Sequence, residues 1–168
     1  MATLPPSTAI DEQTSDAFAP IEFYLPMSYQ PEETIGYIVK SVHLSLLKMI
    51  DIEMQAFDLT ALQWRPLMYI HTNKVNTAAA LAKESCMDTG ATTRMLDRLQ
   101  KKGLLNRKRC SQDRRVVHLE LTEEGQRICQ FIPKSLCKVM NHHLKGFNQA
   151  ELDSLKGLLQ RMLVNGTP

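Results

Sequence analysis

The chain has 168 residues, of which 43% are hydrophobic and 23% are charged, as is typical of a globular domain with its own core. It contains no apolar run long enough to cross a membrane and no secretory signal at its start, so we expect a cytoplasmic protein without membrane contact. The four cysteines show no Cys-x-x-Cys spacing, which indicates reduced thiols rather than a disulfide framework.

Charge is distributed unevenly along the chain. The net charge is only +2, but residues 83–118 hold ten Lys or Arg and four Asp or Glu, which gives this segment +6 and the rest −4. The first 33 residues hold six acidic side chains and no basic one. A basic block on an otherwise acidic protein indicates a localised surface for a polyanion, although a merely solvated charged surface would have the same composition.

The N-terminal segment differs in composition from the remainder. Residues 1–31 hold most of the eight prolines and several Ser and Thr, which predicts an extended arm rather than a domain. The stretch IEFYLPMSY (21–29) is too aromatic for a solvated tail, so we expect it to pack onto another surface. Residues 32–168 are predicted to form a single domain, which begins with a long helix over 32–57 whose apolar residues recur at helical spacing.

A second helix is predicted over residues 60–73. Thr60, with Gln63 three residues later, has the pattern of a capping box at its start. Pro66 lies inside this helix and is expected to kink it or to remove one hydrogen bond.

Two shorter helices follow at the spacing of a helix-turn-helix. The first is the alanine-rich segment 76–85, and Asp88 is expected to cap the second, over 89–102. Gly103 is expected to end the second helix in the left-handed conformation. Two short helices joined by a tight turn predict a helix-turn-helix.

The chain has two good strand candidates, LLNRKRC (104–110) and VVHLELT (116–122), the second of which alternates apolar and polar residues. The polar loop SQDRR between them predicts a β-hairpin. Thr122 is expected to cap a helix that extends to about Lys145, and Asn148 with Glu151 is expected to start the last one.

The order of these elements predicts a fold class. It is mainly α-helical with a small two-stranded β-wing, and the winged helix-turn-helix occupies about 60–121. The outer helices, about 32–57 and 122–165, hold more apolar surface than so small a module can cover. We therefore expect them to form the dimerisation region of a homodimer.

The helix over 89–102 has the properties of a DNA-recognition helix. Its predicted inward side carries Met95, Leu96 and Leu99. The opposite side carries small polar groups, an arginine and an acid, namely Thr89, Gly90, Thr93, Arg94 and Asp97. Thr and Arg near a helix N-terminus can contact base edges in the major groove, whereas an ordinary amphipathic surface helix would show the same periodicity.

The hairpin loop is the second predicted DNA contact. Arg114 and Arg115 can enter the narrow minor groove or its rim, and Asp113 can brace the guanidinium of Arg115. Other basic side chains nearby could reach phosphates, namely Arg98, Arg107, Lys108 and Arg109.

The segment LAKESCMDTGATTRMLDRLQKKGLLNRKRCSQDRRVVHLELTEEG (81–125) resembles the core of the MarR family of winged-helix repressors. The resemblance extends over about 32–165 and includes the Thr-Arg and Asp-Arg-Leu of the second helix, the Asp-Arg-Arg loop and Leu-Thr-x-x-Gly. Ser85 and Cys86 depart from it, because the family usually has an apolar residue and a glycine there. The stretch FYLPMSYQPEETIGYIV resembles a branch of the family with a packed N-terminal arm.

The resemblance implies a homodimeric, sequence-specific DNA-binding regulator. The sequence shows no nucleophile–base pairing, metal-ligand spacing or glycine-rich phosphate loop, so we expect neither enzyme activity nor a cofactor. Its operator is expected to be a pseudo-palindrome of double-stranded DNA with half-sites about 10 bp apart. The family usually represses and is released by a small phenolic or aromatic carboxylate. On this chain, the implied base and groove contacts are Thr89, Thr93, Arg94, Arg114 and Arg115.

The resemblance also implies an effector site between the dimer helices and the DNA-binding lobe. The candidate residues on this chain are Tyr37, His43, Trp64, Arg65 and Met68. Arg65 or His43 could hold a carboxylate. Trp64 and Met68 also fit a plain core role, and His43 also fits an interface histidine.

Three alternatives stay open from the sequence. Cys110 lies among arginines that could lower its pKa, so a thiol-based redox regulator of the same fold is the first. A zinc sensor would need ligands such as Cys137 and the pair His142 and His143, but adjacent residues on a helix point apart. A protein-interaction adaptor that does not bind DNA is the third, and the density of Lys and Arg on the predicted recognition surface argues against it.

Overall fold

The structure is a computed structural model that describes residues 21–85, 87–109 and 116–167. The chain divides into two compact units, residues 1–38 and 39–168. In the N-terminal unit, the short 3-10 helices η2 (Pro26–Ser28) and η3 (Pro31–Glu33) precede the first turn of α1 (Ile35–Met54), where the backbone N–H of Ile35 donates to Tyr24 Oη at 2.9 Å. The apolar side chains of 21–29 are exposed in this structure. That this arm packs onto another surface therefore stays a prediction.

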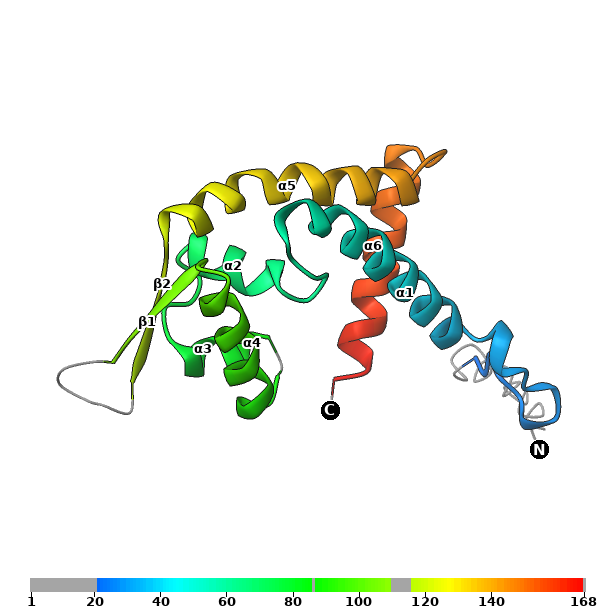
Figure 1. Cartoon of the computed structure of the whole chain (residues 1–168). Helices are drawn as coiled ribbons and strands as arrows, with labels where there is room; N and C mark the ends of the chain where they lie inside the picture. The colour runs from blue at the N-terminus through cyan, green and yellow to red at the C-terminus, as the bar shows by residue number, and fades with distance from the viewer. Residues whose placement is uncertain (1–20, 86, 110–115, 168) are drawn as a thin grey trace, which may run out of the picture. The chain divides into compact units, whose positions relative to one another are not determined.

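The larger unit is mainly helical, with one two-stranded antiparallel sheet, and this confirms the predicted fold class (Figure 1). After α1 and η4 (Gln55–Phe57), its elements are α2 (Trp64–His71), α3 (Ala78–Glu84), α4 (Thr89–Lys101), β1 (Leu105–Arg109), β2 (Val117–Leu121), α5 (Glu123–His143) and α6 (Gln149–Asn165). Within the described ranges, no helix combines the length and the apolar character that a membrane span requires.

The predicted helix starts and stops are confirmed where a side chain or a glycine determines them. Asp88, Thr122 and Asn148 each accept a hydrogen bond from a backbone N–H in the first turn of α4, α5 and α6, and Asn148 completes a capping box. Gly103 has a φ of +69°, and the N–H of Leu104 donates to the last turn of α4 at 3.1 Å.

The start of α2 differs from the prediction. Gln63 Oε1 does accept from the N–H of Thr60 at 3.1 Å, but residues 61–63 form a turn and the helix begins only at Trp64. Pro66 is therefore the third residue of α2. The N–H groups of a first turn have no partner within the helix, so this proline removes no hydrogen bond and the predicted disruption does not arise.

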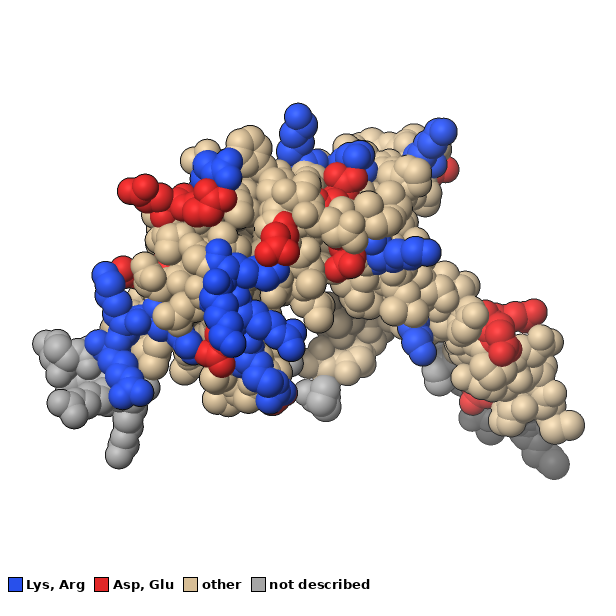
Figure 2. All heavy atoms as spheres, in the orientation of Figure 1, with Lys and Arg blue, Asp and Glu red and all other residues tan. Residues whose placement is uncertain are grey.

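The hairpin attaches to the helix-turn-helix through its second strand. Leu105 pairs with Leu121 at one end of the ladder, and Arg109 pairs with Val117 at the other. The segment before α3 joins this sheet, because the N–H of Leu119 donates to Asn76 O at 2.9 Å. Lys and Arg gather on the part of the surface that α4 and this hairpin form (Figure 2).

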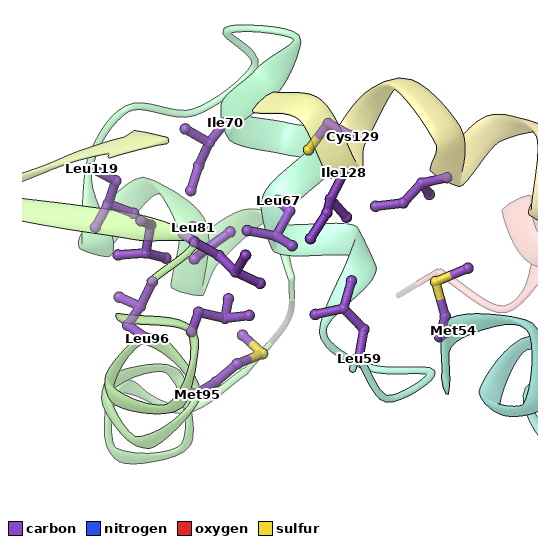
Figure 3. Packing of buried hydrophobic residues seen from close by; sticks show 14 of the residues in the cluster. Met54, Leu59, Leu67, Ile70, Leu81, Met95, Leu96, Leu119, Ile128 and Cys129 are labelled. Atoms are coloured by element: carbon purple, nitrogen blue, oxygen red, sulfur yellow. The ribbon is translucent and has the colours of Figure 1, made fainter. Parts of the chain in front are cut away.

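The hydrophobic core holds these elements together. Its buried side chains come from each of the helices α1 to α5 and from both strands, and include Leu99, Leu105 and Ile132. Figure 3 shows others of this cluster, among them Met54, Leu67, Leu81, Leu96 and Leu119. Met95, Leu96 and Leu99 are all buried, which confirms the predicted inward side of α4. The opposite side of α4 is consequently fixed toward solvent.

Candidate nucleic-acid interface and adjoining cavity

The outward side of α4 is built from its cap. Asp88 Oδ1 accepts from the N–H of Ala91 at 2.8 Å, and the buried hydroxyl of Thr92 donates to Asp88 O at 3.0 Å. These bonds fix the first turn, so that the exposed residues Thr89, Gly90, Thr93 and Arg94 share one side of the helix. The hydroxyl of the exposed Thr93 donates to Thr89 O at 2.8 Å, and its oxygen can still accept a hydrogen bond from another group.

Arg94 lies back over the first turn of α4. A Cβ on Gly90 would be 3.4 Å from Arg94 Nη1 and 3.1 Å from Asp88 Oδ1, so the glycine makes room for the guanidinium. The carboxylate of Asp88 is occupied by its cap bond. Within the described part of the chain, Arg94 makes no salt bridge, and the same holds for Arg98 and Lys101.

Arg107 has a different position from the one predicted. Its Nη2 lies 2.5 Å from Asp97 Oδ1, and its Nε donates to Gln100 Oε1 at 2.7 Å. The side chain is thus engaged by two groups of α4 and only 29% exposed. Arg107 therefore links β1 to α4. Because its guanidinium already bonds to two groups of α4, this geometry does not favour the phosphate contact expected from the sequence.

The other predicted DNA contacts are exposed or lie outside the described residues. Arg98 and Arg109 are exposed, on the last turn of α4 and at the end of β1. Asp113, Arg114 and Arg115 belong to the connection between β1 and β2 and lie outside the described residues. The described part of the interface is therefore the outward side of α4 and the end of β1 that leads into this connection.

A cavity of about 600 Å3 lies behind the helix-turn-helix. Its walls come from α1, the turn before α2, α2 itself, the α3–α4 turn and α5, and are formed by His43, Leu46, Leu47, Ile50, Ala61, Leu62, Trp64, Arg65, Pro66, Ser85, Met87, Leu136 and Met140. Most of these side chains are apolar. A mostly apolar cavity with a few polar groups is the usual form of a small-molecule site.

Three of the five predicted effector contacts meet at this cavity. His43 approaches from α1, while Trp64 and Arg65 open α2, with the Arg65 guanidinium 5.4 Å from the centre of the Trp64 ring. Met68 is not among the lining residues and packs against the core, in agreement with the alternative role considered for it. Tyr37 belongs to the N-terminal unit.

Sequence reasoning missed the wall that the helix-turn-helix contributes. Ser85 and Met87 lie on the α3–α4 turn and line the cavity together with Leu136 and Met140 of α5. The only signal at Ser85 was its departure from the apolar residue usual in the resembled family.

The thiol of Cys129 on α5 is buried. Burial raises its pKa from 9.0 to about 11. Among the described residues, the other free cysteine is Cys137, which is exposed, and no group of three His, Cys, Asp or Glu could hold a metal ion. Cys110, the predicted redox candidate, lies outside the described residues.

We expect Cys129 to resist thiol reagents in the folded protein at neutral pH, because the nucleophilic thiolate is suppressed. Alkylation with iodoacetamide followed by peptide mass spectrometry should label Cys137 far faster, and the two should react alike in denaturant. The raised pKa also means that the contribution of the protonated thiol to stability is complete below pH 9 and is lost as pH rises toward 11. Equal labelling of both cysteines in the native protein would contradict this assignment.

Comparison with known proteins agrees with this geometry. Residues 59–117 match the family model of the MarR family. The chain is also similar to YhbI, an HTH-type transcriptional regulator of Bacillus subtilis, at 32% identity over 91 residues. This match covers 54% of this chain and 59% of YhbI, so the chain matches less than two thirds of the length of that relative.

Solved structures match over a larger share of the chain. A mutant of E. coli MarR in complex with operator DNA is 29% identical, with a TM-score of 0.71 over 77% of this chain and 93% of that one. BpsR of Bordetella bronchiseptica, whose DNA binding is regulated by 6-hydroxynicotinic acid, has the same fold at 20% identity, with a TM-score of 0.72 over 83% of this chain and 99% of that one. Over residues 59–117 in sequence, and over most of its length in fold, the chain is similar to transcriptional regulators of the MarR family.

Proposed function

We propose that the protein is a dimeric DNA-binding repressor that releases its operator when a small aromatic acid binds. The outward side of α4 is the observation that supports DNA binding. Arg94 has no salt-bridge partner there among the described residues, and small polar groups flank it. This side is continuous with the basic surface in Figure 2. α4 would enter the major groove, with the Arg114–Arg115 connection at the adjacent minor groove. Such a regulator acts in the cytoplasm, on chromosomal DNA.

A second copy of the chain would cover the apolar surface of α6. None of the residues of α6 is buried, and it exposes Leu155, Leu158, Leu159, Met162, Leu163 and Val164. Leu163 and Val164 are 73% and 71% exposed. A helix of this length with a continuous apolar side needs a partner surface, and a two-fold dimer would supply one. The dimer would place two copies of α4 about 10 bp apart on a pseudo-palindromic operator.

The cavity would be the effector site. The aromatic ring of an acid fits the wall of Leu46, Ile50 and Trp64, and Arg65 or His43 would face its carboxylate. Because the walls of the cavity include α1, α5 and the α3–α4 turn, a bound acid would favour one position of α4 relative to the dimer helices. Binding to that state more tightly than to the DNA-competent state would release the operator.

The experiment that tests the proposal is a gel shift with the purified protein on DNA from upstream of its own coding sequence. The panel of compounds is benzoate, salicylate and 6-hydroxynicotinate, with hydrogen peroxide as the oxidant arm. A specific shift released by one acid supports the proposal. A shift released only by the oxidant would favour the alternative redox regulator at Cys110, and the absence of any specific shift would overturn DNA recognition.

Salt dependence separates a DNA-binding protein from an adaptor. Contacts with phosphates release counterions, so operator affinity should fall steeply as salt concentration rises. A flat dependence would favour the adaptor.

The Arg115→Ala variant is expected to weaken operator binding by about tenfold while the dimer stays intact, because an arginine in the minor groove is attracted by its concentrated negative potential. Fluorescence anisotropy with labelled operator measures the affinity, and sedimentation measures the dimer. Lys134→Ala on α5 removes the same charge from an exposed position outside the candidate interface and is the matched control. Operator affinity equal to that of the wild type would refute the role of the connection between β1 and β2.

A further inference from the structure

Ser85 carries a buried hydroxyl that has no hydrogen-bond partner among the described residues. Its backbone is satisfied, because the N–H donates to Leu81 O at 2.9 Å at the end of α3. The same residue lines the cavity behind the helix-turn-helix. A buried hydroxyl without a partner lowers stability, so this hydroxyl calls for a partner beyond the described residues.

The cavity places both apolar and polar side chains around this hydroxyl. The walls near it are mostly apolar, with Leu46, Ile50, Leu136 and Met140 among them. Besides Ser85, the lining side chains with hydrogen-bonding groups are those of His43, Trp64 and Arg65. A ligand with both an aromatic body and an oxygen would match this distribution of apolar and polar groups.

The position of Ser85 in the chain links the cavity to the DNA-binding surface. Ser85 is the C-cap of α3, and Asp88, three residues later, is the N-cap of α4. Met87, between them, also lines the cavity. A ligand bonded to Ser85 therefore touches the turn that sets the start of α4, whereas its contacts with His43 and Arg65 are with α1 and α2.

We propose that the Ser85 hydroxyl is a specificity-determining group for the effector, and donates a hydrogen bond to an oxygen of an aromatic acid in the cavity. The proposal rests on the proposed function and names the residue that couples this cavity to α4. The bond supplies the missing partner of the hydroxyl and holds the α3–α4 turn in the ligand-bound position.

Trp64 gives a direct readout of binding. It is the only tryptophan of the chain and it lines the cavity. The probes are benzoate, salicylate and 6-hydroxynicotinate, each titrated by tryptophan fluorescence and by calorimetry. Ser85→Ala is expected to weaken the binding of the acid by about tenfold, because it removes a hydrogen bond to a charged group. Ser85→Thr keeps the hydroxyl and is expected to restore most of the affinity.

Two controls distinguish a ligand contact from a structural role. Ser45→Ala removes a hydroxyl that hydrogen-bonds to His143 Nε2 at 3.0 Å. Ser45 does not line the cavity, so this variant should leave acid binding unchanged. Toluene lacks the oxygens, so its affinity should be the same for the wild type and for Ser85→Ala. Without a ligand, Ser85→Ala should melt at the same temperature as the wild type or higher, since the hydroxyl has no hydrogen bond to a described residue that the substitution would remove.

The outcomes separate this inference from the proposed function. Equal acid affinity of wild type and Ser85→Ala overturns the inference and leaves the regulator intact, as does a lower melting temperature of the ligand-free variant. A protein that binds its operator but none of the three acids also overturns the inference, without affecting DNA recognition. Absence of operator binding, by contrast, removes the proposed function itself.

Discussion

Gly125→Ala is expected to destabilise the folded protein by about 3 kcal/mol, at the upper end of what overpacking costs in a closely packed site. Gly125 is buried in the first turn of α5. A Cβ at this position would overlap the carbonyl oxygen of Leu104 and lie 3.0 Å from its carbon. The obstacle is backbone, so a side-chain rotation cannot relieve it.

The junction around Gly125 cannot move away without losing other bonds. The Leu104 oxygen already accepts from the N–H of Thr122 at 3.1 Å, and the Thr122 hydroxyl donates to Gly103 O at 2.6 Å. These bonds tie the end of α4 to the start of α5 and so hold the hairpin between them. We expect the variant to lose this junction first.

Chemical denaturation at one protein concentration measures the effect. Gly157→Ala in α6 is the matched control, because a Cβ there meets nothing within 4 Å. The alanine should raise stability by up to about 1 kcal/mol through its higher helix propensity. Equal stability of the two variants would show that α5 does not approach the backbone of Leu104 this closely.

Arg94→Ala is expected to have the largest effect on operator binding, a loss of roughly tenfold to a hundredfold. A bidentate arginine contact with guanine contributes about 1–3 kcal/mol of discrimination. Arg94 lies on the exposed side of α4, and Met95 and Leu96 beside it are buried, so the substitution should leave the fold unchanged.

The comparison of operator with unrelated DNA identifies the kind of contact. Loss of a base contact should weaken operator binding much more than binding to unrelated DNA, whereas loss of a phosphate contact should weaken both alike. Lys134→Ala on α5 removes the same charge from an exposed position outside the candidate interface and is the control. Unchanged operator affinity in Arg94→Ala would exclude α4 as the recognition helix in the proposed orientation.

The sequence by itself determined the features that depend on near neighbours in the chain. The caps at Asp88, Thr122 and Asn148 and the left-handed Gly103 were predictable, because each involves groups within a few residues of one another. The inward side of α4 followed from helical periodicity in the same way. These local signals were sufficient for the fold class.

Only the tertiary structure decided the features that depend on residues far apart in the chain. It paired Arg107 of β1 with Asp97 of α4, which engages this arginine within the protein, and it brought His43 of α1 to the same cavity as Arg65. It also placed the Ser85 hydroxyl in that cavity without a partner among the described residues. Such contacts are set by how the helices pack, because a side chain's charge and size do not specify which distant group it will meet.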